Sequence, residues 1–215
     1  NTFARVNLRA AAETAGINGY IKVVSNAANG LTANFGAVKE EKDDGMLTVT
    51  GGGSKKLDVQ VWNVADGINK ASLTLSGKLT TKDTGMLFTS GDKLTVAAGT
   101  ELNSGKALGL IGKNGVTTDG NDEKPVTLTA ATDLVVRAAS GTINLAKVRD
   151  TITAGGTEEL TGQSIKLYNL QADAAKLTAT AGDIAFDGSL QTATSLTATA
   201  TGYIKAVGDR AYIEA

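Results

Sequence analysis

The residues best suited to chemistry in this sequence lie in one acidic turn. Asp119, Asn121, Asp122 and Glu123 bring four oxygen-bearing side chains together around Gly120. Hard cations such as Ca²⁺ bind oxygen ligands at close spacing of this kind. The spacing of an EF-hand loop is absent, however, and acidic turns that contain glycine are usually solvated loops. A solvated loop is therefore the preferred interpretation, and a calcium site at these four residues is the alternative; no other cofactor is predicted.

Two common catalytic residue types are missing from the sequence. The chain has no Cys and no His, which excludes thiolate nucleophiles, disulfides and the commonest general base. Paired carboxylates can cleave polysaccharides, but the acidic residues here cluster in predicted turns and not on adjacent strands. The aromatic residues that could stack on sugar rings are scattered. We predict that the chain is not an enzyme, and a polysaccharide-active enzyme is kept as an alternative.

Threonine pairs of the form Thr-x-Thr recur along the chain. Stacked on one flat face, they would form an ordered hydroxyl array of the kind that binds ice. Their sequence spacing is irregular, and Thr is in any case a favoured outward-facing strand residue, so ice binding is a further alternative and not the main prediction. The pairs are Thr48/Thr50, Thr127/Thr129, Thr151/Thr153, Thr178/Thr180 and Thr197/Thr199.

Composition and charge narrow the class of protein. The 215 residues include 21 basic and 22 acidic side chains, so there is no basic surface for nucleic acid or for an anionic membrane. No run of eighteen apolar residues is present, and membrane insertion is not predicted. Aromatic residues make up 4% of the chain. The predicted core must therefore be packed from small and β-branched side chains.

The elements that carry these residues are predicted from internal repeats. Gly19-Tyr-Ile-Lys22 recurs as Gly202-Tyr-Ile-Lys205, and Leu94 is followed by similar segments at Leu134 and Leu177. These separations are near multiples of about 20 residues, which is typical of solenoids. We expect Leu94, Leu134 and Leu177 to lie in a single interior column.

Within each repeat, apolar residues alternate with polar ones and Gly, Asn or Asp bounds the run, which predicts short strands joined by turns. A unit of about 20 residues cannot fold alone, but stacked units can pair in parallel. The predicted fold is an all-β, right-handed parallel β-helix (β-solenoid) of about ten coils, forming one domain over residues 1–215. Residues 113–124 are predicted to be a loop excursion. Residues 4–15 fit either a strand or a helix, and the strand is preferred.

The recurring pattern Leu-x-Ala-x-Ala-Gly-x-Ile resembles the repeats of filamentous haemagglutinin-like exoproteins, which include two-partner secretion adhesins and contact-dependent inhibition proteins. Residues 177–188, 196–208 and 134–145 carry the pattern, and residues 94–105 and 8–24 carry it more loosely. The resemblance implies a secreted protein that forms a structural or adhesive shaft at the surface of a bacterium.

Both ends of the sequence look like interior coils, because the first and last recognisable units share Gly-Tyr-Ile-Lys. Soluble solenoids normally end in polar capping repeats, and no such repeat is recognised in this sequence. Two functions follow. The preferred one is a shaft segment of a larger surface exoprotein, whose coils continue in the same chain and which could carry a binding site for a host or neighbouring-cell receptor. The alternative is a filament subunit that stacks head to tail.

Overall fold

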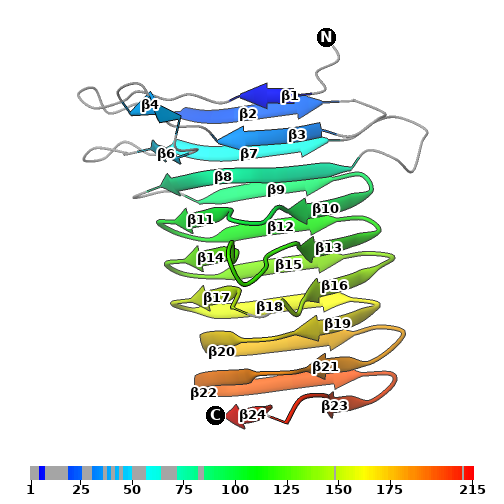
Figure 1. Ribbon diagram of the computed structural model, residues 1–215. Coiled ribbons are helices and arrows are strands. Elements are labelled where there is room, and N and C mark those ends of the chain that lie inside the picture. Colours follow the sequence, from blue (N-terminus) through cyan, green and yellow to red (C-terminus); the bar gives the residue numbers. More distant parts are fainter. Residues whose placement is uncertain are drawn as a thin grey trace.

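Figure 1 shows the chain as a computed structural model, which describes residues 5–7, 19–25, 31–35, 38–39, 42–43, 46–49, 57–63, 72–81, 85–147, 149–209 and 211–215. Every element in these ranges is a β-strand. The strand pairs are parallel, except that β4 (Val38–Lys39) and β5 (Lys42–Asp43) form an antiparallel pair. The predicted all-β parallel solenoid is therefore confirmed.

The strands form a ladder on three faces of the solenoid (Figure 1). The first face contains β1 (Arg5–Asn7), β3 (Leu31–Phe35), the start of β8 (Leu73–Thr81), β10 (Lys93–Val96), β13 (Gly115–Thr118), β16 (Thr142–Leu145), β19 (Ser164–Leu167), β21 (Ile184–Phe186) and β23 (Ile204–Ala206). The second face contains β6 (Met46–Val49), the end of β8, β11 (Glu101–Ser104), β14 (Thr127–Ala130), β17 (Thr151–Ala154), the starts of β20 (Leu170–Ala179) and β22 (Ser189–Ala200), and β24 (Tyr212–Glu214). The third face contains β2 (Gly19–Ser25), β7 (Leu57–Asn63), β9 (Met86–Ser90), β12 (Leu108–Gly112), β15 (Leu134–Ala138), β18 (Thr157–Gly162) and the ends of β20 and β22.

Over the described residues from Leu73 to Ile204, the chain makes about six turns. On the first face, paired residues one turn apart form a column from Leu73 to Ile204, which also contains Leu94, Val116, Ile143, Ile165 and Ile184. Steps along this column range from the short one between Ile165 and Ile184 to the long one between Val116 and Ile143. This coil count differs from the predicted ten, and one reason lies before Leu73: its register partner in the preceding coil is Leu31, so this step spans about twice the 20 residues on which the prediction was based.

The predicted alignment of three leucines is wrong. Leu94 lies on the first face, whereas Leu134 and Leu177 lie on the third face in two different columns. All three side chains are nevertheless fully buried. Because turn length varies, a constant sequence separation does not return the chain to the same position in the coil.

Alternation within the strands builds the core. β9, β12 and β15 each bury their first, third and fifth residues and turn the others outward. The buried side chains belong to one apolar cluster that extends from Leu73 to Leu190. Burial of apolar area at about 25 cal/mol per Å² is the main term that favours folding. Among the residues whose burial is described, the core therefore runs along the solenoid axis from Leu73 to Leu190.

The predicted loop excursion at residues 113–124 has different bounds. Gly115–Thr118 is strand β13, which pairs with β10 and β16, and the connection to β14 begins at Asp119. Val116 and Thr118 point inward on either side of Thr117, and Val116 lies in the same column as Leu94. This alternation explains why the stretch forms a strand. Of residues 4–15, which were predicted as a strand, Arg5–Asn7 is strand β1, and residue 4 and residues 8–15 lie outside the described residues.

Candidate functional site

The acidic connection between β13 and β14 is held by both neighbouring coils. The Asp119 amide donates to the Val96 carbonyl at 2.9 Å. The Val126 amide donates to Oδ1 of the buried Asp150 at 2.8 Å. Arg149, whose φ of 71° lies in the left-handed region, donates from Nη1 to the Asp122 carbonyl at 3.2 Å. The connection is thus tied to the coil before it and the coil after it.

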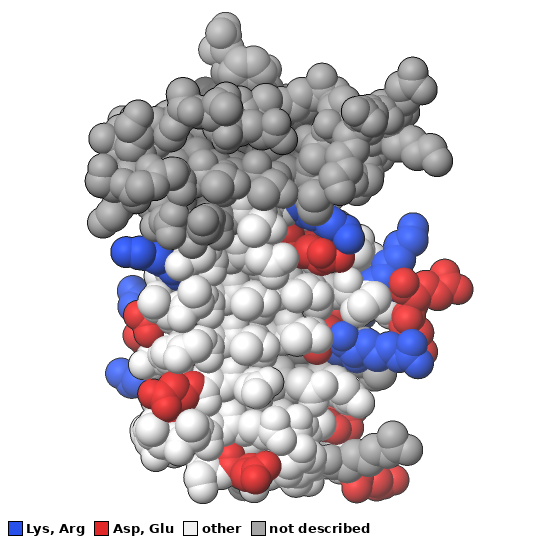
Figure 2. All heavy atoms as spheres, turned by 90° about the vertical axis from the view of Figure 1, so that its left-hand side faces the viewer, with Lys and Arg blue, Asp and Glu red and all other residues white. Residues whose placement is uncertain are grey.

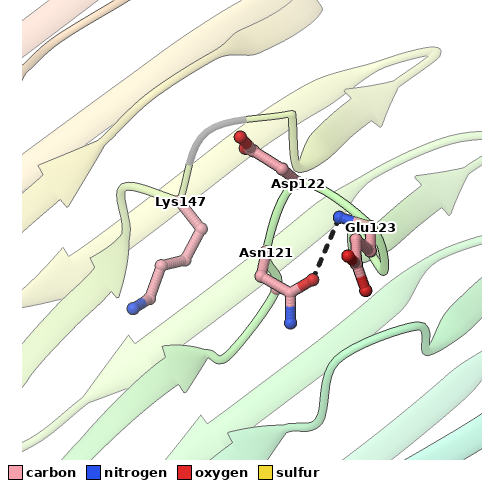
Figure 3. A pocket seen from close by; sticks show the side chains of 5 residues that line it. Asn121, Asp122, Glu123 and Lys147 are labelled. Atoms are coloured by element: carbon pink, nitrogen blue, oxygen red, sulfur yellow. Dashed lines mark hydrogen bonds between the residues drawn. The ribbon is translucent and has the colours of Figure 1, made fainter.

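The predicted calcium ligands are drawn in Figure 3, apart from Asp119. Asn121 uses its side-chain oxygen to accept the amides of Glu123 at 3.1 Å and Lys124 at 2.9 Å, which closes the turn. The Asp122 and Glu123 carboxylates point away from each other (Figure 3). Together with Lys147, these residues line an open hollow of about 520 Å³. Calcium binding stays a prediction, and these side-chain directions do not strengthen it.

The acidic side chains of the residues that the structure describes do not gather into a metal-binding group. No group of three or more acidic side chains among them lies close enough to hold a metal ion. Within the same residues, no helix is long and apolar enough to cross a membrane.

One hydrogen bond between successive coils recurs. An Asp or Asn side chain accepts it, and the donor is the backbone amide of a residue that directly follows a glycine. Oδ1 of Asp133 accepts the amide of Thr157 at 2.9 Å, and Oδ1 of Asp183 accepts the amide of Tyr203 at 2.8 Å. Asn169 accepts the amide of Ser189 in the same way at 3.0 Å. Each acceptor stands directly before a strand, and each donor lies one turn later. We call these three contacts the Asx clamps.

The residue before each clamp donor is glycine. A Cβ atom at Gly156, Gly188 or Gly202 would lie closer than 3.0 Å to the clamp oxygen. Real Cβ atoms essentially never approach so closely, so a side chain at these positions would displace the clamp oxygen from its hydrogen bond. Gly208 has the same close approach to the carboxylate of Asp187. Glycine therefore allows the coil spacing that the clamp hydrogen bonds require.

Glu158 places a carboxyl group in the apolar core. It is the second residue of β18 and is fully buried, and neither carboxyl oxygen has a hydrogen-bond partner. Its register neighbours on the two adjacent strands are Leu134 and Ala175. Loss of hydration disfavours the charged form of a buried carboxyl. Burial accordingly raises the pKa of Glu158 from 4.5 to about 8.

The outward side of the second face is polar but mostly uncharged. Figure 2 shows this side of the molecule with its charges gathered toward the margins of the described surface. The column of register partners along it consists of Thr80, Asn103, Thr129, Thr153, Gln171 and Gln191. The face therefore presents hydroxyl and amide groups at the regular spacing of adjacent strands, about 4.8 Å.

The predicted Thr-x-Thr pairs are brought together in part. Thr127 and Thr129 are the register partners of Thr151 and Thr153, so two pairs stack directly despite their sequence spacing. Thr197, by contrast, is opposite Lys176 on the third face. The five pairs are thus divided between faces, and Thr50 lies outside the described residues.

Ion pairs on the outer surface also join successive coils. Lys78 contacts Glu101 at 2.6 Å and Arg137 contacts Glu159 at 3.4 Å, all with partly exposed side chains. Lys205 pairs with Asp183, the acceptor of the last Asx clamp. The hydrogen bond from Lys205, followed by that from the Tyr203 amide, holds the pKa of Asp183 below its ordinary value. Exposed pairs of this kind add little to stability, because solvent screens them.

The described residues define the class of this protein as a parallel β-solenoid with three strand faces and a continuous apolar core. No family model matches the chain, and neither a curated protein nor a solved structure shows significant similarity to it.

Two features were missed by the sequence analysis, although the sequence carries a signal for each. Leu160 and Gly162 set the inward phase of β18, and counting back by two from Leu160 places Glu158 inward. The Asx clamps combine an Asp or Asn directly before a strand with a glycine one turn later. This signal needs the turn lengths, which the sequence alone does not supply.

Proposed function

We propose that this chain is a structural segment of an extracellular β-helical shaft, of the kind that holds an adhesive or toxic tip away from a bacterial surface. The parallel ladder on three faces and the continuous core support a mechanical role. Main-chain hydrogen bonds between the described strands run parallel to the axis and resist bending. The sequence pattern at residues 177–188 supports the same class of exoprotein.

The last coil provides the observation that carries this proposal. Ile204 and Ile213 continue the buried columns of Ile184 and Leu190, yet 49% and 50% of their surface is exposed. Tyr203 and Val207 on the same coil are exposed at 76% and 59%. A further coil of the same kind would bury these side chains and pair with the open strand edges. We infer that another coil is the partner of this surface.

The further coil could belong to the same polypeptide, as in a shaft, or to a second copy, as in a filament. Electron microscopy and sedimentation of the purified chain separate the two. A shaft segment gives short rods of one length, with little dependence on concentration. A filament subunit gives fibres that lengthen with concentration, because a head-to-tail contact does not close.

Variants make the assembly test specific. Replacing both Ile204 and Ile213 by lysine places charges on the surface that a further coil would cover, and it should abolish any end-to-end association. Thr151→Lys, an exposed outward-facing change on β17 in the middle of the solenoid, is the matched control and should leave association unchanged. Fibres that persist in the double variant would show that this end is not the contact.

Placement outside the cell is tested separately. Antibodies against the chain should label intact, unpermeabilised cells of the source organism, and external protease should remove the label. Labelling that requires permeabilisation would contradict an extracellular role while leaving the solenoid fold untouched.

A further inference from the structure

One interior column of the third face contains a carboxyl group. Met86, Leu108, Leu134, Glu158 and Ala175 follow one another in register, and all five are buried. The other four members are apolar. A carboxylate in such surroundings loses its hydration without receiving a hydrogen bond, whereas the protonated acid loses much less. A single proton at this position therefore changes the free energy of the folded core.

No opposite charge faces Glu158 from the elements around it. Leu134 and Val136 on β15, Ala175 and Leu177 on β20, and Ile143 and Ile165 on the first face are the inward residues at this level. Asp150, the buried acid near β17, has its own partner in the Val126 amide. The remaining titratable groups of the neighbouring elements are at least partly exposed: Asp133, Arg137, Glu159, Lys166, Asp173 and Lys176.

The exposed first residue of the same strand gives water a short route to the carboxyl. Glu158 is preceded by Thr157, which is exposed and is held by the Asx clamp from Asp133. Gly155 and Gly156 form the turn before it. A short separation of β18 from β15 at this corner would hydrate the carboxyl without disturbing the strands of the first face.

We propose that Glu158 makes this coil a proton-dependent joint, closed while the carboxyl is protonated and opened locally at the β17–β18 corner when the carboxyl ionises and takes up water. The joint would let a shaft yield at one defined coil in an alkaline medium while the coils on either side stay packed. The raised pKa of Glu158 places the change near pH 8.

The sign of the pH dependence follows from linkage. The folded-state pKa lies above the value of 4.5 expected in the unfolded chain, so the contribution to stability is complete below pH 4.5. It is lost as pH rises toward 8, because the unfolded chain releases a proton that the folded chain keeps. The unfolding equilibrium constant should change about tenfold per pH unit, or by roughly three to four powers of ten in total.

Two measurements on the full chain test the joint. Carboxyl-carbon NMR should show Glu158 titrating near pH 8. Hydrogen exchange, corrected for intrinsic rates, should show β18 amides losing at least about tenfold more protection above pH 8 than β13 amides. Glu158→Gln should abolish both the exchange change and the pH slope of unfolding. Glu159→Gln, the outward-facing neighbour on the same strand, should leave both in place; if Glu158→Gln does not fold, Glu158→Leu replaces it.

The outcomes are distinct. Titration of Glu158 near 4.5, or an unchanged pH slope in Glu158→Gln, would overturn the proposal. Equal loss of protection in β13 and β18 would also overturn it, because the opening would then be global. None of these results depends on whether the chain is a shaft segment or a filament subunit.

Discussion

Oδ1 of Asp133 accepts a hydrogen bond from the backbone amide of Thr157, one turn later in the solenoid, at 2.9 Å. The same relationship recurs at Asn169 and Asp183. Strand pairing alone can slip by two residues without changing which side chains face inward. A side-chain acceptor at a fixed turn position adds a contact that slipping would break.

Asp133→Ala should destabilise the chain by about 1 kcal/mol, because it removes the acceptor of the Thr157 amide. Asp133→Asn should recover most of this loss, since Asn169 shows that an amide oxygen fills the role. Urea unfolding midpoints would measure the difference. Equal stability of the Ala and Asn variants would argue against the clamp.

Gly141→Ala should be costly. A Cβ atom at this buried position would lie closer than 3.0 Å to the Asn114 carbonyl, which is backbone and cannot turn away. We expect a loss of about 1–3 kcal/mol. Gly182→Ala is the control at the same corner two coils later, where the nearest atoms lie at 3.3 and 3.4 Å, and it should cost less than half as much in thermal or urea unfolding.

Leu128→Ala should lower stability by about 2–5 kcal/mol, because it leaves a cavity in the core where the side chain is fully buried. Thr129→Ala removes a side chain from the outward side of the same strand and should change stability by no more than about 0.5 kcal/mol. Similar losses for both variants would contradict the inward and outward phase of β14.

The last coil should loosen in acid. The folded-state pKa of Asp183 is lowered from its ordinary value of 3.8 by Lys205 and by the Tyr203 amide. Its contribution is therefore present above pH 3.8 and is lost as pH falls through the lower folded value. Exchange of the Tyr203 amide should increase below that pH. In Lys205→Gln the increase should begin at higher pH; an unchanged onset would show that the ion pair does not matter.

These two acids respond to pH in opposite directions for one physical reason. Glu158 has lost water and gained no partner, so its neutral form is favoured. Asp183 has gained a cation and an amide donor at the surface, so its charged form is favoured. Alkaline medium therefore acts on the middle of the solenoid, and acid acts on the last coil.

The amino-acid sequence by itself determined that this chain forms short parallel strands in stacked coils. Alternation such as that of Leu134, Val136 and Ala138 buries every second residue whichever coil lies next to it. Glycine and Asp or Asn between such runs end the strands for local reasons. Neither signal depends on distant parts of the chain.

The tertiary structure decided which residues become neighbours. Leu94 and Leu134 look equivalent in sequence but lie on different faces, while Thr127 and Thr151 become partners despite irregular spacing. The long connection between Asp119 and Val126 lengthens its turn, so residues after it no longer fall at multiples of 20 from those before it. The register of the coils depends on the turn lengths and on contacts such as the one between Asp133 and Thr157. These contacts form only when the coils are assembled, so no local stretch of sequence determines them.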